Sequence, residues 1–186
     1  MALFILGMVI FFGAHLFTAL MREPRARLAG KIGEMPYKGL YSLVSIAGFI
    51  LIIVGWKGAD QSVLYVTPVW TRHITYLLVL IAFIFLAAAY LPAGKIAAGA
   101  KHPMLAGVKL WALGHLLVNG EVRSVILFGA FLAYGVIDRI AVKKRGEMGR
   151  AAGPVRNDAL AILVGVAAWA AIAFYGHKFI AGVALF

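Results

Sequence analysis

The chain of 186 residues contains no cysteine. This absence excludes disulfides, thiolate metal sites, iron–sulfur clusters and the covalent attachment of a c-type haem. Charge is also scarce, because Asp, Glu, Lys and Arg make up 13% of the residues, about half the usual share. Any polar chemistry must therefore come from a small number of side chains.

Hydrophobic residues are correspondingly abundant. They make up 63% of the chain, against about 45–50% in an ordinary globular domain, and the mean hydropathy is +0.95. A soluble domain of this size has too little interior to hide so much apolar surface. The composition therefore predicts an integral membrane protein whose main partner is the lipid bilayer.

Six apolar segments approach the length of about 20 residues that a membrane-spanning helix needs. They cover residues 2–21, 39–56, 73–94, 103–120, 124–137 and 159–177. The fifth is short, and Arg123 and Arg139 at its ends are expected to extend it by snorkelling. The runs are continuous, with prolines at or near their ends, which favours helices over a β-barrel. We expect an all-α bundle of about six transmembrane helices, in a single domain over residues 1–186.

The formal net charge of +11 is spread over short segments between the apolar runs. This distribution is typical of a loop bias in a membrane protein, and we expect no nucleic-acid partner. Thirteen of the 18 lysines and arginines follow the first, third or fifth segment. By the positive-inside rule those connections are cytoplasmic, which places both termini on the outer, periplasmic side.

Ionisable side chains within the apolar segments are the first functional candidates, because they are costly to bury in lipid. They are His15, Lys109 and His115. No acidic residue lies deep in an expected span, so paired-carboxylate hydrolysis and carboxylate proton relays lack their parts. The chemistry is expected to come from histidine.

His15 lies seven residues before Arg22. In a continuous helix this spacing places both side chains on one face, about 10 Å apart along the axis. The pair suits a flat amphipathic ligand, such as a b-type haem bound at His15 with its propionates reaching Arg22. The alternative is a histidine that simply hydrogen-bonds to a neighbouring helix.

His115 is expected to share a helix face with Trp111 and Asn119, and Asn119 could fix the tautomer of the imidazole. Packing alone is the alternative. Lys109 either snorkels or contacts an anionic substrate or a propionate. His102, immediately before Pro103, is expected at the membrane interface or near the start of a helix. Two histidines buried on different helices raise the expectation of one shared ligand.

Residues 101–121 read KHPMLAGVKLWALGHLLVNGE. This segment resembles the signature of the NnrU family of bacterial membrane proteins, and GAHLF at 13–17 and PYKGLYSLVSIAGF at 36–49 fit the same family. The resemblance implies a multi-pass protein of the bacterial inner (cytoplasmic) membrane, associated with nitrite and nitric oxide respiration, the reactions of denitrification.

The NnrU family is also similar to the 15-cis-ζ-carotene isomerase, a membrane enzyme with b-type haem. That likeness implies haem b as cofactor, His15 and His115 as iron ligands and His102 as a further matching histidine. It also implies haem-dependent isomerisation of an apolar substrate such as a carotenoid.

Several alternatives stay open. Counted from the cytoplasmic surface, the depths of His15 and His115 differ by about 9 Å at 1.5 Å per residue, so His15 could instead pair with His102, or ligation could be single and switchable. The protein could be a haem protein with redox or isomerase chemistry. It could also be a non-enzymatic accessory or sensor that partners a nitric oxide or nitrite reductase. A small transporter that uses Lys109 and His115 is the third alternative.

Overall fold

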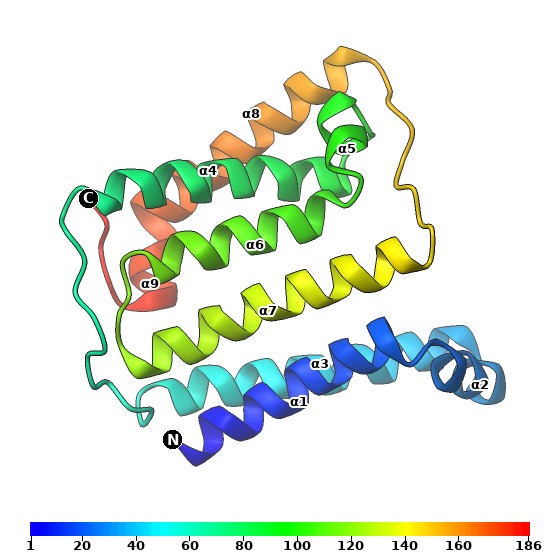
Figure 1. Ribbon diagram of the computed structural model, residues 1–186, viewed down its shortest axis with the longest axis horizontal. Helices are drawn as coiled ribbons and strands as arrows, with labels where there is room; N and C mark the ends of the chain where they lie inside the picture. The colour runs from blue at the N-terminus through cyan, green and yellow to red at the C-terminus, as the bar shows by residue number, and fades with distance from the viewer. The chain divides into compact units, whose positions relative to one another are not determined.

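The apolar runs of the sequence form long helices. The computed structural model describes residues 1–186, and its regular elements are all helical (Figure 1). In chain order they are α1 (Ala2–Leu20), α2 (Arg22–Ile32), α3 (Glu34–Trp56), α4 (Thr71–Tyr90), α5 (Lys95–Ala100), α6 (Pro103–Leu116), α7 (Val122–Lys144), α8 (Val155–Ala171), a π-helical turn η1 (Ile172–Gly176) and α9 (His177–Ala181). The only strand-like pairing is an isolated bridge between Val63 and Glu121.

Five stretches are long and apolar enough to cross a membrane: α1, α3, α4, α7 and the stretch Val155–Ala181 that begins with α8. The expectation of an all-α, multi-pass membrane protein is therefore confirmed. The sixth expected segment forms α6, a helix of 14 residues. At 1.5 Å per residue it is about 21 Å long, shorter than the hydrocarbon core of about 30 Å. Length alone therefore does not support a sixth span.

Some helix ends differ from the expected ones. Helix α3 begins at Glu34, five residues before the expected start, and α7 continues to Lys144. Because α7 is longer than expected, Asp138 lies inside a helix of membrane-spanning length. The expectation that no acidic residue lies deep in a span did not take in Asp138, which directly follows the expected end of the fifth segment at residue 137.

The helices form two compact units. The first contains Met1–Val66 and Gly120–Arg145, and the second contains Thr67–Asn119 and Gly146–Phe186. In the first unit, α1 contacts both α3 and α7. In the second, α4 contacts both α6 and α8. Each unit thus has three long helices, with the middle one covered on two sides.

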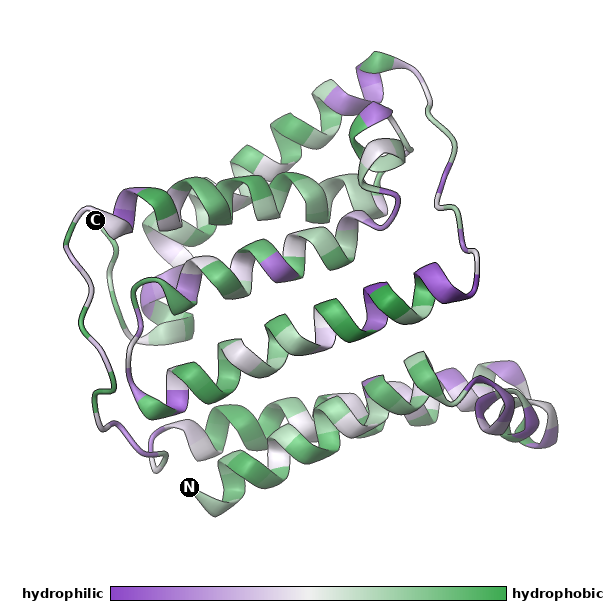
Figure 2. Ribbon diagram, in the orientation of Figure 1, coloured by the Kyte–Doolittle hydropathy of each residue, from purple (hydrophilic) through white to green (hydrophobic).

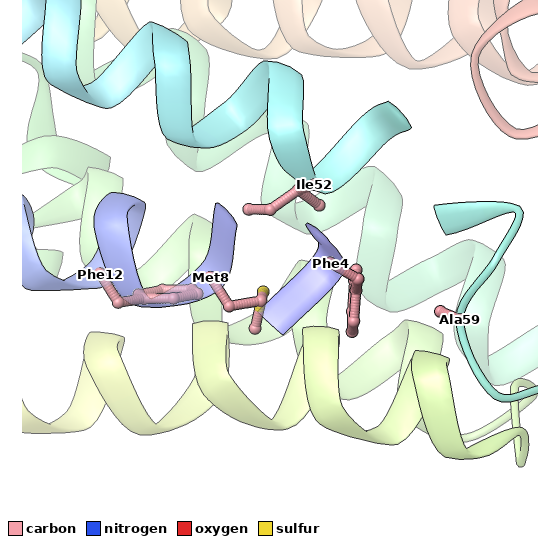
Figure 3. Packing of buried hydrophobic residues seen from close by; sticks show 5 residues of the cluster. All are labelled: Phe4, Met8, Phe12, Ile52 and Ala59. Carbon is pink, nitrogen blue, oxygen red and sulfur yellow. The ribbon is translucent and has the colours of Figure 1, made fainter. Parts of the chain in front are cut away.

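The core of the first unit is a cluster of buried side chains from α1, α3 and the loop that follows α3 (Figure 3). Its members are Phe4, Met8, Phe12, Ile52 and Ala59. Side chains of α7 such as Phe131 and Tyr134 pack against it. The cluster therefore joins all three long helices of this unit.

The loop after α3 also folds onto the start of α7. The backbone N–H of Leu64 donates to the carbonyl of Gly120 at 2.7 Å. A Cβ at Gly120 would lie only 1.8 Å from the carbonyl oxygen of Tyr65, so the close approach requires glycine. Residues 119–121, the end of the segment that resembles the family signature, are thus where the chain leaves the second unit and enters α7.

In the second unit, small residues of α6 lie against α4. The Thr75 hydroxyl donates to the carbonyl of Gly114 at 2.9 Å, and a Cβ at Gly107 would lie 2.9 Å from the carbonyl oxygen of Ala82. Gly107 and Gly114 thus permit the close approach of α6 to α4.

A buried carboxylate fixes the short helix α5. Asp158, in the first turn of α8, is 8% exposed. It accepts hydrogen bonds from the backbone N–H of Lys95 at 2.9 Å and of Ile96 at 2.8 Å. These are donors at the start of α5 that have no partner within that helix. Asp158 therefore caps α5 from a distant part of the chain.

Replacing Asp158 by Ala is expected to lower the free energy of unfolding by about 1–3 kcal/mol, because it leaves two partly buried N–H donors without acceptors. Thermal unfolding of the purified protein in one detergent measures the change. The control is Asp60→Ala, whose carboxylate also accepts a backbone N–H, that of Ser62 at 2.8 Å, but lies in an exposed turn. Equal melting temperatures for the two variants would contradict the capping role.

Candidate functional site

His15 lies on α1 in a pocket of aromatic rings within the first unit. Its ring stacks on Phe11 with centroids 4.2 Å apart, and the rings of Tyr41 and Tyr134 lie at 5.4 and 5.6 Å. Nδ1 is 2.7 Å from the carbonyl oxygen of Phe11. A carbonyl oxygen only accepts, so Nδ1 carries the proton and Nε2 carries the lone pair. This tautomer is the one that binds a metal through Nε2.

His115 lies on α6 in the second unit and repeats this local arrangement. Its Nδ1 donates to the carbonyl of Trp111 at 2.8 Å, and the two rings have centroids 4.9 Å apart. Nε2 again carries the lone pair. Both histidines therefore have an aromatic residue four positions earlier, whose carbonyl fixes the tautomer and whose ring orients the imidazole.

Asn119 has a different role from the expected one. Its amide Nδ2 donates to the backbone carbonyl of His115 at 2.8 Å, which satisfies an acceptor at the end of α6. The His115 ring nitrogen Nδ1 donates instead to the backbone carbonyl of Trp111. Asn119 thus supports the backbone that carries His115.

The expectation that His15 and Arg22 share one continuous helix is wrong. Helix α1 ends at Leu20, and Arg22 is the first residue of α2. Pro24 explains the break, because it has no N–H to donate to the carbonyl of Leu20 and its ring would clash with that carbonyl. The face shared across seven residues therefore does not exist, although both residues belong to the first unit.

His102 is the N-cap residue of α6, directly before Pro103, as the sequence indicated. Its Nε2 lies 3.2 Å from the carbonyl oxygen of Glu147 and therefore carries the proton. Its protonation pattern is thus the opposite of that of His15 and His115. Lys109 lies six residues before His115 on α6, which places it on a different face of the helix.

An acidic residue that the sequence analysis did not select lies beside the His15 pocket. The Tyr134 hydroxyl donates to the Asp138 carboxylate at 3.3 Å, and Asp138 is within electrostatic range of His15. Tyr134 and Asp138 are four residues apart on α7, so they share one face. That spacing was visible in the sequence, but the proximity of α7 to His15 was not.

Tyr134 also lines an apolar groove of about 420 Å³ between α1 and α7. Its lining includes small residues such as Gly13, Ala130 and Ala133. Tyr134 thus lies between this groove and the ring of His15.

In the second unit, His177 lies within electrostatic range of His115. Its Nδ1 donates to the carbonyl of Val183 at 2.7 Å, within the turn that follows α9. No group of three or more His, Cys, Asp or Glu side chains is arranged as a metal site, so metal binding to a cluster of such side chains alone is not indicated.

The fold and these sites define an all-helical, multi-pass membrane protein with two histidines in matching helical environments. Residues 3–185 match the family described as NnrU protein, and the chain belongs to the NnrU family. No curated protein and no solved structure matches the chain. The resemblance to this family that residues 101–121 indicated is thus confirmed, and the match extends over nearly the whole chain.

Proposed function

We propose that this NnrU-family protein binds haem b, with His15 and His115 as the iron ligands. The observation that carries the proposal is the shared tautomer: in both residues a backbone carbonyl takes the Nδ1 proton, which leaves the Nε2 lone pair for a metal. A second partner that fixes the tautomer and ring orientation is typical of metal-binding histidines. With no cysteine in the chain, imidazole is the natural strong ligand for haem iron.

The residues around the two histidines suit such a group. Phe11, Tyr41 and Tyr134 surround His15 with apolar ring surface, and Trp111 covers one side of His115. These ring contacts, together with the hydrogen bonds from Nδ1, orient the imidazoles. Bound haem would supply one-electron redox chemistry, and nitric oxide would bind its iron only by displacing one of the two imidazoles. The proposal places that chemistry in nitrite and nitric oxide respiration or in the isomerisation of an apolar molecule.

Absorption spectra of the purified protein test this proposal. The protein is produced with excess haem precursor, and spectra are recorded oxidised, reduced and reduced with nitric oxide. We expect a Soret band with about one haem per chain, which shifts on reduction. A protein that is folded by circular dichroism but has no Soret band would remove the proposal.

We also propose that α6 is embedded in the membrane as a sixth helix and that both termini face the periplasm. Leu117 and Val118, which follow α6, add apolar length beyond the helix itself. Of the 18 lysines and arginines, only four lie in segments assigned to the outer side: Lys57, Arg72, Arg123 and Lys178. This topology is tested with single cysteines introduced at positions 57 and 144. A membrane-impermeant reagent is applied to intact inner-membrane vesicles of known orientation, and labelling of each cysteine is measured. Labelling of both from the same side would overturn it.

Asp138 is expected to influence the potential of the bound haem. Asp138 accepts a hydrogen bond from the Tyr134 hydroxyl at 3.3 Å, and the Tyr134 ring lies 5.6 Å from the ring of His15. A nearby negative charge stabilises the oxidised, more positive iron. Replacing Asp138 by Asn should therefore raise the midpoint potential in a redox titration. Tyr134→Phe is the control, since it removes the hydrogen bond to Asp138 but keeps the carboxylate, and should change the potential less. A lower potential in Asp138→Asn would contradict this role.

A further inference from the structure

Helix α2 carries an excess of positive charge at one end of the first unit. The segment from Arg22 to Lys38 holds five basic residues and two acidic ones. Of the acidic residues, Glu34 contacts Arg25 at 2.9 Å and Lys38 at 3.7 Å. Arg27 and Lys31 are exposed and form no ion pair, although Glu23 lies four residues before Arg27 on the same helix. Arg27 and Lys31 are four residues apart, so they lie on the same face of α2.

The orientation of α2 is fixed by contacts on its other side. Ala29 is buried, and the guanidinium of Arg25 lies over the ring of Tyr37 at 5.0 Å while it pairs with Glu34. These contacts hold α2 against the start of α3. The face with Arg27 and Lys31 therefore points away from the helices of this unit, and Figure 2 shows α2 as a largely hydrophilic helix beside apolar ones.

The end of α7 adds further positive charge at the same end of this unit. The Arg145 guanidinium donates to the carbonyl of Ala19 at 2.9 Å, which brings the end of α7 to the end of α1. Lys143 and Lys144, directly before Arg145, are exposed. Two pairs of exposed cations, on α2 and on α7, therefore lie near the end of α1.

The chain leaves α2 little freedom to move away from the membrane surface. Single residues, Met21 and Gly33, connect it to α1 and α3, and both of these helices are long enough to cross a membrane. At 11 residues α2 is about 16 Å long, and it lies across the ends of α1 and α3 (Figure 1). The ends of membrane-spanning helices lie at the depth of the lipid headgroups and their phosphates.

We propose that α2 and the end of α7 form a binding surface for the headgroups of anionic phospholipids, with Arg27 and Lys31 as its main contacts and Lys143 and Lys144 beside them. The charge of the surface complements a phosphate diester, and its depth favours a lipid over a soluble partner. A basic side chain near an anionic membrane surface contributes about 1 kcal/mol, which corresponds to about a fivefold change in affinity per charge.

Native mass spectrometry of the purified protein in a neutral detergent tests this surface. Phosphatidylglycerol and phosphatidylcholine with identical acyl chains are titrated against the wild type, the double variant Arg27→Gln/Lys31→Gln and the control Lys57→Gln/Lys178→Gln. The control removes the same charge from exposed positions outside the surface. We expect the wild type and the control to prefer phosphatidylglycerol. In the α2 double variant the ratio of the two affinities should fall by up to about 25-fold, since each of the two charges contributes about fivefold.

Three results would overturn the proposal. One is an unchanged lipid preference in the α2 double variant, and another is an equal loss in the control, which would show an effect of net charge alone. The third concerns the protein reconstituted into vesicles of pure phosphatidylcholine. If an acidic soluble protein binds these vesicles with the wild type but not with the α2 variant, while the lipid preference of the variant is unchanged, the surface serves a protein partner. Circular dichroism and thermal unfolding of each variant show that the fold is retained. None of these readouts depends on haem.

Discussion

The variants His15→Ala and His115→Ala, each produced with excess haem, are expected to retain little of the Soret absorbance of the wild type. Changing only the outer partner of a metal-binding histidine typically costs 10- to 100-fold in affinity or activity, so loss of the ligand itself should cost at least about that much. The haem content per chain is measured after gel filtration, so that free haem does not contribute.

His73→Ala is the matched control for these two variants. His73 lies in the first turn of α4 with its ring 6.4 Å from that of Tyr76, and the account gives it no role at iron. It should keep full haem content. The variants His15→Gly and His115→Gly add a second readout, because free imidazole should restore part of the absorbance if the missing group was the ligand. Full haem content in either Ala variant would exclude that residue as a required ligand.

Gly55→Ala is expected to disrupt the packing of α1 on α3. A Cβ at Gly55 would lie 2.4 Å from the backbone nitrogen of Phe4, and one at Gly48 would lie 2.7 Å from the backbone nitrogen of Phe11. The clashing atoms belong to the backbone, so the two helices must move apart and the contacts of the buried cluster must weaken. Overpacking of this kind typically costs about 1–3 kcal/mol, and sometimes more.

The same substitution at Gly39 provides a control on the same helix. A Cβ at Gly39 meets nothing within 4 Å, and alanine favours a helix over glycine by about 1 kcal/mol. Gly39→Ala should therefore raise the melting temperature slightly, whereas Gly48→Ala and Gly55→Ala should lower it. Because the opposite signs come from one chemical change, equal shifts at Gly39 and Gly55 would contradict the close approach of α1 and α3.

The long helices were predictable from the sequence because lipid imposes a strong constraint on composition. Each needs an apolar run without charge, and α1 and α4 lie within two residues of their expected starts. The start of α6 at Pro103 was also expected, since proline is favourable in the first turn. The short helices α2 and α5 were missed, because neither has an apolar run of that kind.

The candidate site was predicted only in part. His15 and His115 were selected by their position within apolar runs, and Trp111 was correctly placed beside His115. The carbonyls that fix the two tautomers could have been anticipated from the spacing, because positions i−4 and i are adjacent on a helix. Asp138 required tertiary structure, since only the packing of α7 on α1 brings it near His15.

The continuous face from His15 to Arg22 failed for a local reason. A face shared by His15 and Arg22 requires a continuous helix through Met21. Pro24 prevents this, because its effect reaches back four residues to the carbonyl of Leu20. Arg22 therefore belongs to the basic helix α2, and its side chain is exposed there. A contact between Arg22 and a haem propionate remains a prediction.

Ligation of one haem iron by both His15 and His115 is tested by electron paramagnetic resonance of the oxidised, haem-loaded wild type. Two imidazoles on one ferric iron give a low-spin signal, which we expect to dominate in the wild type and to be lost in both His15→Ala and His115→Ala, where the small amount of haem that remains should be high-spin. A wild type whose iron is high-spin throughout, or whose low-spin signal survives in either variant, would contradict ligation by these two histidines.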